Sequence, residues 1–266
     1  MNVIIFSKNR ACQLDLLLRT MELNWKTVKD NRVWVLWTAT SDALAEGYRL
    51  TFDRHEWVDT MCEGNFKNDL LSVFDTAQRF SMFLVDDVVF RAPFDPDEAA
   101  LLDELDRDAR IACISLRLCR RINYCYSKSI KSPQPITPEG LEYMLWAWRT
   151  QVGDWSYPMS LDGNIFRTED IHPRLMHLEY SNPNTLEDRL AGPSIDRPLM
   201  ACYFDSKLFG VPLNKVQTVR PLNKSENIDA DIINKSYLVG KRMSVRPYQG
   251  YENRAAHEVV APVWEG

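Results

Sequence analysis

The stretch RFSMFLVDDVVFRAPFD, residues 79–95, places two adjacent carboxylates between two apolar runs. Asp86 and Asp87 follow the apolar residues 82–85 and precede the apolar residues 88–90. The run before the pair is typical of a buried strand. A carboxylate is costly to bury unless it is paired, hydrogen-bonded or bound to a cation. Two acids at the end of such a strand therefore indicate a functional site, and the alternative is that they cap a turn through backbone hydrogen bonds.

Alternating strand and helix patterns surround this stretch. Residues 2–6 (NVIIF) and 31–42 (NRVWVLWTATSD) predict buried strands that end in polar residues. Residues 13–24 (QLDLLLRTMELN) and 68–80 (NDLLSVFDTAQRF) predict helices, and residues 81–87 the third strand. This order predicts an α/β fold with a mostly parallel central sheet flanked by helices.

Polar residues follow each of the three predicted strands. They are residues 7–10, residues 38–42 and the pair Asp86 and Asp87. In parallel α/β sheets the ligand lies beyond the carboxyl ends of the strands. We therefore expect these three polar strand ends to converge on one crevice.

The composition is that of an ordinary globular protein. The chain has 266 residues, 45% hydrophobic and 26% charged, without repeats or a low-complexity linker, so we expect a single domain. The formal net charge of −5 argues against a protein that depends on broad attraction to nucleic acid. The chain has six cysteines without a CxxC pair and no apolar run long enough to span a membrane. Its N-terminus predicts a strand in place of a signal peptide. We therefore expect a cytoplasmic protein with no transmembrane segment.

The remaining chain gives less regular patterns. The acidic residues 95–108 predict a helix that precedes a strand, and residues 139–150 (EGLEYMLWAWRT) predict a helix with Trp146 and Trp148 on different sides. Residues 183–192 predict a helix capped by Asn184 or Thr185. The polar tail, residues 221–256, either wraps the domain or becomes ordered on ligand binding. Aromatic residues between 146 and 157 suit stacking on a glycan or hydrophobic packing equally well.

Two adjacent carboxylates at a strand end are hard oxygen ligands suited to Mg²⁺ or Mn²⁺. A divalent ion held there can bridge the oxygens of a diphosphate and neutralise a departing phosphate. The residues alone therefore favour a metal or ribose site over a capped turn.

In their order along residues 1–210, four motifs resemble the GT-A class of nucleotide-sugar glycosyltransferases, in particular family-2-like members. They are VIIFSKNRACQLDLLLRTM, a strand ending in VDD, SLDGNIFRTEDI and NPNTLEDRL. The resemblance implies a single Rossmann-like GT-A domain over residues 1–266. Residues 1–118 would form the nucleotide-binding half, residues 119–220 the acceptor-binding half and residues 221–266 a C-terminal tail.

The resemblance also implies roles for individual residues. Asp86 and Asp87 match the Asp-x-Asp-like motif, with Asp87 on the metal and Asp86 near the ribose, although the strict spacing is absent. A C-terminal histidine serves as a further metal ligand in some GT-A enzymes, and His257 is the candidate here. Ser7 and Arg10 match the positions that hold the nucleotide base and phosphates, and Asn65 and Lys67 are candidates for the nucleotide, with plain surface charge as the alternative. Thr38, at the second predicted strand end, is a further candidate for the nucleotide sugar. Asp162 would bind a hydroxyl of the donor or of the acceptor.

LEDRL resembles the Glu-Asp pair that lies near the acceptor in inverting family-2-like enzymes. Asp188 would then be the catalytic base, and Glu187 would orient the acceptor or the base. The alternative is that both acids respond to the dipole of the helix N-terminus. If the reaction retains configuration, the pair could instead stabilise the sugar transition state, so the stereochemistry stays open.

These observations predict a glycosyltransferase that moves a sugar from a nucleotide-diphosphate sugar to a hydroxyl of a glycan or other acceptor, with Mn²⁺ or Mg²⁺ assisting. One alternative is a catalytically silent sugar- or nucleotide-binding protein of the same fold. A sugar nucleotidylyltransferase is less favoured, because FSKNRACQ has no glycine for the loop that such enzymes need. The sequence does not indicate an oligomeric state.

Overall fold

The computed structural model describes residues 1–266 apart from 97–99, 193–195, 217–224 and 227. Its centre is an eight-stranded sheet with the order β3-β2-β1-β4-β10-β6-β11-β9. These strands are β1 Asn2–Lys8, β2 Val33–Thr38, β3 Asp59–Cys62, β4 Phe80–Val85, β6 Ile111–Ser115, β9 Tyr143–Ala147, β10 Asn164–Arg167 and β11 Leu199–Tyr203. The pairs β1–β2, β1–β4, β2–β3 and β6–β11 are parallel, whereas β10 and β9 pair antiparallel with their neighbours.

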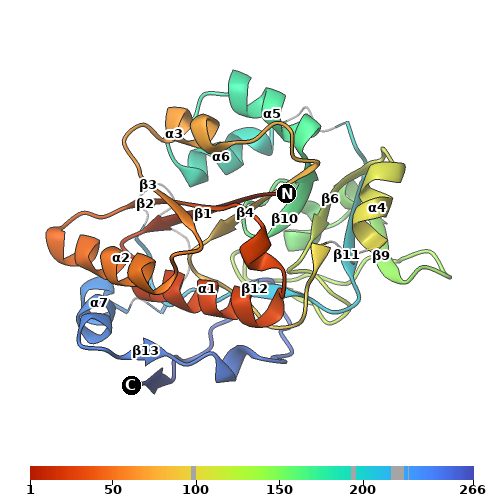
Figure 1. Cartoon of the computed structure of the whole chain (residues 1–266). Helices are drawn as coiled ribbons and strands as arrows, with labels where there is room; N and C mark the ends of the chain where they lie inside the picture. The colour runs from red at the N-terminus through yellow and green to blue at the C-terminus, as the bar shows by residue number, and fades with distance from the viewer. Residues whose placement is uncertain (97–99, 193–195, 217–224, 227) are drawn as a thin grey trace.

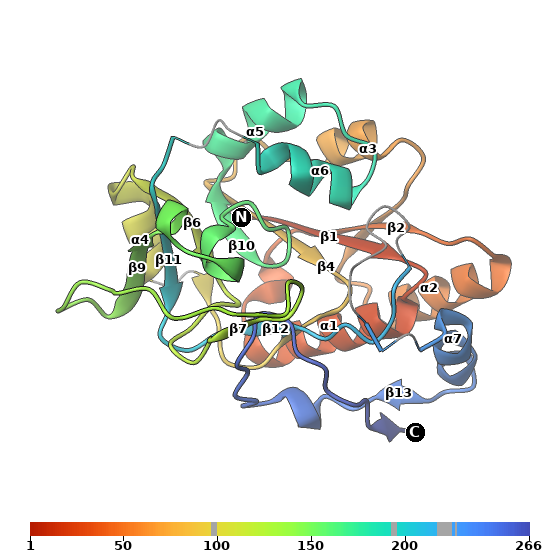
Figure 2. The same ribbon diagram turned by 180° about the vertical axis from the view of Figure 1, so that it is seen from behind.

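Helices cover both faces of the sheet (Figures 1 and 2), so the predicted α/β class is confirmed. One face carries α1 Ala11–Asn24, α2 Asp42–Arg54 and α7 Ala230–Leu238, and the other carries α3 Phe66–Val73, α5 Thr168–His177 and α6 Pro183–Leu190. α4 Ala100–Arg107 packs beside β6. Successive residues of β1 point to opposite faces. Ile5 therefore packs in the α1 core and Ile4 in the core shared with α3 and α6.

Short elements connect this framework. β5 Val88–Phe90 pairs antiparallel with β12 Leu208–Gly210 directly after Asp87. The remaining short strands are β7 Tyr124–Cys125 with β8 Ile130–Lys131, and β13 Arg242–Met243 with β14 Trp264–Glu265. The 3-10 turns are η1 Val28–Asp30, η3 Trp148–Thr150, η4 Gly153–Ser156 and η5 Arg246–Tyr248.

The predicted helix over residues 139–150 is wrong. Residues 143–147 form β9, the edge strand that pairs with β11, and η3 follows it. Trp146 lies buried edge-on against Trp155, with ring centroids 4.9 Å apart, and its Nε1 donates to the carbonyl of Trp155 at 2.8 Å. Trp148 is half-buried and donates to the carbonyl of Arg197. Pairing to β11 and burial of the aromatic rings override the helix pattern here.

The predicted caps of α6, Asn184 and Thr185, are also wrong. The N-cap is Asn182, whose side chain accepts from the Thr185 amide at 3.0 Å, while Thr185 Oγ1 accepts from the Asn182 amide at 3.1 Å. Pro183 therefore occupies the first helical position, where it needs no backbone donor. Glu187 and Asp188 lie in the second turn, so the dipole of the first turn does not explain them.

The C-terminal tail wraps the domain wherever the structure describes it. Tyr237 of α7 and Tyr248 are fully buried, and α7 packs on α2. Residues 221–224 and 227 of that predicted tail, and residues 97–99 of the predicted acidic helix, lie outside the described residues. Among the described helices, none is long and apolar enough to cross a membrane.

Candidate active site

The carboxyl ends of β1, β2 and β4 open into one cavity of about 390 Å³. The convergence predicted from the strand order is therefore present, with Ser7, Thr38 and the two adjacent acids in its lining. Of the predicted site residues, these line the cavity: Ser7, Arg10, Thr38, Asp86, Asp87, Asp162, Glu187 and His257.

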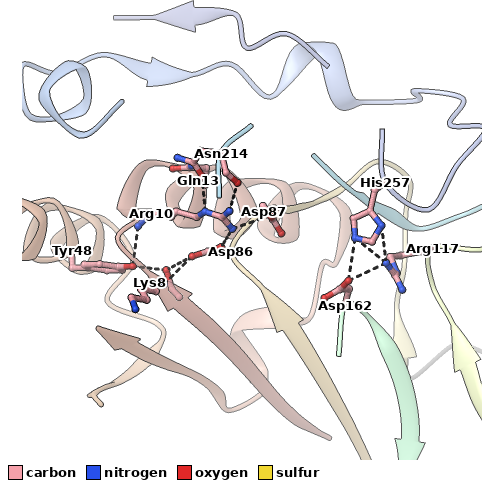
Figure 3. A network of polar contacts seen from close by, with 11 residues as sticks. Lys8, Arg10, Gln13, Tyr48, Asp86, Asp87, Arg117, Asp162, Asn214 and His257 are labelled. Carbon is pink, nitrogen blue, oxygen red and sulfur yellow. Dashed lines mark hydrogen bonds and ion pairs between the residues drawn. The ribbon is translucent and has the colours of Figure 1, made fainter. Parts of the chain in front are cut away.

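Arg10 binds both acids at the end of β4 (Figure 3). Its Nη1 donates to Asp86 Oδ1 and to Asp87 Oδ2, each at 2.9 Å. Its Nε donates to Asn214 Oδ1 at 2.6 Å, and its Nη2 donates to the Asn214 carbonyl. The guanidinium of Arg10 is therefore hydrogen-bonded to the two acids on one side and to Asn214 on the other. Burial lowers the pKa of Arg10, but Asp87 and Asp86 more than offset it, so its pKa lies above the ordinary value.

Both acids line the cavity, but Asp86 is the more deeply buried of the two. Asp86 Oδ2 accepts from Ser7 Oγ at 2.8 Å and from the Lys8 amide at 3.1 Å, and Ser7 Oγ also lies 2.6 Å from the Tyr48 hydroxyl. Burial raises the pKa of Asp86 to about 6, against the opposing charge of Arg10. The Asp87 side chain is 17% exposed, compared with 4% for Asp86.

The turn between β1 and α1 brings Arg10 back over the carboxylates. Asn9 has a φ of 58°, in the left-handed region that asparagine tolerates better than most residues. Its side chain exchanges two hydrogen bonds of 2.9 Å with Thr40 in the loop after β2. Two strand ends are therefore joined at the point where the chain reverses.

Asp87 fits a divalent ion that is shared with a substrate, but not a preformed metal site. Asp87 Oδ1 has no hydrogen-bond partner among the described residues, while both oxygens of Asp86 are used. Within the described part of the chain, no group of three His, Cys, Asp or Glu side chains is placed to hold a metal. Mg²⁺ is commonly held by one or two carboxylates together with phosphates and water. Asp87 can supply that single carboxylate.

His257 does not fit as a second metal ligand. Its Nε2 lies 3.1 Å from Asp162 Oδ2 and 3.2 Å from Arg117 Nη1, and its Nδ1 lies 3.4 Å from the same Arg117 nitrogen (Figure 3). Because an ionised carboxylate can only accept, the contact with Asp162 requires a hydrogen on Nε2, and the Arg117 cation lies beside both ring nitrogens, where it repels a metal ion. Burial lowers the pKa of His257, but the hydrogen bond that its imidazole donates to Asp162 raises it, and the pKa lies above its ordinary value.

The two acids of α6, Glu187 and Asp188, lie in different surroundings, one at the cavity and one in solvent. Glu187 lines the cavity, and its Oε1 accepts from the backbone amide of Leu161 at 3.2 Å, next to Asp162. Asp188 is exposed and is not part of the lining. The geometry therefore favours Glu187, not Asp188, for contact with a ligand.

Asn65 and Lys67 lie outside the cavity lining. Asn65 caps α3 by accepting from the Asn68 amide at 3.1 Å, and Lys67 Nζ pairs with Glu179 Oε1 at 3.0 Å.

Sequence reasoning did not identify Tyr48, Arg117 and Asn214. Tyr48 lies on α2, which the sequence patterns did not identify, and the other two lie in loops without a recognisable motif.

No protein-family model and no curated protein matches the sequence. Among solved structures, the chain is similar to S. aureus TarS, with 15% identity and a TM-score of 0.46 over 79% of this chain. It spans only 36% of the length of TarS. It is also similar to the apo form of mouse xyloside xylosyltransferase 1, with 9% identity and a TM-score of 0.38 over 71% of this chain and 80% of the mouse chain. The fold is α/β, with a mixed eight-stranded sheet flanked by helices. Both TM-scores lie below 0.5, so these likenesses do not indicate a function.

Proposed function

We propose that this protein is a glycosyltransferase that moves a sugar from a nucleotide-diphosphate sugar to a hydroxyl of a glycan or other acceptor. The observation that carries the proposal is Asp87, a carboxylate fixed by Arg10 at the carboxyl end of a central parallel strand. It opens on a cavity whose lining also includes Asp162 and Glu187. In a parallel sheet this is the position at which a nucleotide binds.

The cavity provides different chemistry in its two parts. The strand ends around Ser7, Lys8 and Thr38 would hold the nucleotide, and Asp87 would hold Mg²⁺ or Mn²⁺. Such an ion, when bound, neutralises charge on the departing diphosphate. Asp162 would accept a hydrogen bond from a sugar hydroxyl.

Glu187 is the proposed general base. It would take the proton of the acceptor hydroxyl while that oxygen attacks the anomeric carbon and the bond from this carbon to the diphosphate breaks. The electron pair of the broken bond leaves with the diphosphate. Glu187 is suited to this role because the Leu161 amide fixes its carboxylate at the cavity wall. A direct displacement of this kind inverts the anomeric configuration.

A thermal-shift panel of nucleotide sugars with Mn²⁺ tests the proposal. A ligand at about 100 times its Kd should raise the melting temperature by roughly 5 °C. Asp87→Ala should abolish this shift, while Asp53→Ala, on the exposed side of α2, should keep it. If no nucleotide or nucleotide sugar stabilises the protein, the proposal is wrong. Stabilisation without turnover toward any acceptor would favour a silent binding protein.

A further inference from the structure

The C-terminal segment brings a histidine into the cavity from about 90 residues beyond β10, where it meets Asp162 and Arg117 (Figure 3). Asp162 Oδ2 accepts from His257 Nε2 and from Arg117 Nη1, each at 3.1 Å. Arg117 is itself fixed, because its Nη2 donates to Ser160 Oγ at 2.6 Å. Two donors from distant parts of the chain therefore set the direction of a single carboxylate oxygen.

The fold contains a seat for this imidazole. The backbone of Gly210 at the end of β12 bonds to both neighbours of His257. Its amide donates to the Ala256 carbonyl, and its carbonyl accepts from the Glu258 amide, each at 2.9 Å. A Cβ added at Gly210 would lie 2.3 Å from His257 Cδ2. The ring thus fills the space that any other residue at position 210 would need.

The same strand is connected to the carboxylate pair. Gly210 pairs with Val88, the residue after Asp87, and the Val211 amide donates to the Asp87 carbonyl at 2.7 Å. The seat of His257 and the backbone of Asp87 are therefore held by one β5–β12 ribbon. This connection fixes the Asp162 side of the cavity relative to the Asp87 side.

The local charges favour an orienting role. The Arg117 side chain is 5% exposed, and the side chains of Asp162 and His257 are 18% and 23% exposed. All three side chains are therefore partly or largely shielded from water. Asp154 is the other charged group that acts on His257. Partly buried, charge-assisted hydrogen bonds hold their geometry better than exposed ones.

We propose that His257 is a positioning residue that, together with Arg117, holds the Asp162 carboxylate in the orientation that binds a hydroxyl of the transferred sugar. The role of Asp162 rests on the proposed function. The C-terminal segment is then part of the sugar subsite and not only a covering of the domain.

Kinetic measurements with the nucleotide sugar found by the panel test this role. His257→Ala and Gly210→Ala should each lower kcat/KM for the donor about tenfold. The Kd of the matching nucleoside diphosphate and the half-saturating Mn²⁺ concentration should stay within about twofold. His257→Gln, which keeps a donor, should recover part of the loss. Gly64→Ala is the matched control, because a Cβ there meets nothing nearer than 4.0 Å.

A double-mutant cycle separates positioning from independent effects. In an Asp162→Asn background, His257→Ala should cause no further loss, because the residue acts through Asp162. If the losses of the two single variants multiply in the double variant, the proposal is wrong. It is also wrong if His257→Ala raises the half-saturating Mn²⁺ concentration, because His257 would then be a metal ligand. Melting curves verify that each variant folds.

An NMR measurement keeps this inference apart from the proposed function. The ¹⁵N shifts of His257 should show a hydrogen on Nε2 in the unmodified protein and should change in Asp162→Asn. Unchanged shifts would mean that the contact does not exist in solution, and the positioning role would be wrong. If the shifts change but no nucleotide sugar binds, the contact stands and the glycosyltransferase proposal fails, together with the sugar role of Asp162.

Discussion

Arg10 occupies a position between two carboxylates that only a branched, planar cation can serve. A single nitrogen, Nη1, reaches Asp86 and Asp87, while Nε and Nη2 reach Asn214. A lysine has one ammonium group and cannot make both sets of bonds. We expect Arg10→Lys to lower the free energy of unfolding by about 2 kcal/mol, measured by urea denaturation.

The control for Arg10 is an exposed arginine with the same kind of partner. Arg32 donates to Asp59 at 2.6 Å, but both side chains are largely solvent-exposed, and such pairs contribute little. Arg32→Lys should leave the free energy of unfolding within about 0.5 kcal/mol of the unmodified protein. Equal effects at both positions would show that Arg10 makes no special contribution.

Glu187 and Asp188 provide a matched pair of substitutions on one helix. Glu187→Gln should lower kcat about 100-fold or more and leave the affinity for the nucleotide unchanged, because only proton transfer is lost. Asp188→Asn should keep nearly full activity, since Asp188 is exposed and outside the cavity lining. A large loss in Asp188→Asn with Glu187→Gln active would restore the assignment that the sequence resemblance implies.

For single residues, the sequence predicts membership of the site better at the ends of strands than in loops. Ser7 and Thr38 lie in the last residues of β1 and β2, Asp86 and Asp87 directly follow β4, and all four line the cavity. Asn214 is 204 residues from Arg10, and its contact depends on the path of a loop that no local pattern encodes. Arg10 lies at the predicted strand end, but its neutralisation by two acids became visible only in three dimensions.

At the scale of the element, α6 depends on its cap to present Glu187. Asn182 and Thr185 form a reciprocal capping box ahead of the cavity-lining turn. Asn182→Ala should lower the free energy of unfolding by about 1 kcal/mol and speed hydrogen exchange of the first-turn amides. Asn182→Asp keeps a capping oxygen and should remain close to the unmodified protein. If the alanine and aspartate variants behave alike, the cap has no role in stability.

The elements that sequence reasoning missed share a physical cause. β9 has a helix-like spacing of apolar residues, but its stability comes from pairing with β11, a contact between segments about 55 residues apart that a local window cannot detect. β3 is only four residues long and alternates half-buried with exposed positions. β1, β2 and β4 were predicted because burial on both faces makes them almost continuously apolar.

At the scale of the whole molecule, a buried charge cluster ties the C-terminal segment to α1. Asp15 of α1 is completely buried and accepts from Arg19 Nε at 3.0 Å, from Arg242 Nε of β13 at 3.0 Å and from His55 Nε2 at 3.1 Å. Burial raises the pKa of Asp15, but His55 and Arg242 more than offset it, so the pKa lies below its ordinary value.

A depressed carboxylate pKa fixes the sign of the pH dependence. The ionised form of Asp15 is favoured in the folded protein, so its contribution is complete above the unfolded-state pKa of about 3.9 and is lost as the pH falls toward the folded-state pKa. We expect Asp15→Asn to lower the free energy of unfolding by about 3 kcal/mol at neutral pH, because Arg19 and Arg242 lose their buried partner. The gap between the two proteins should narrow below a pH of about 4. Urea denaturation from neutral pH to below about pH 4 measures this difference in the free energy of unfolding, with the exposed Asp53→Asn as control. A gap that stays constant or widens in acid would show that the Asp15 cluster does not hold the C-terminal segment through its charge.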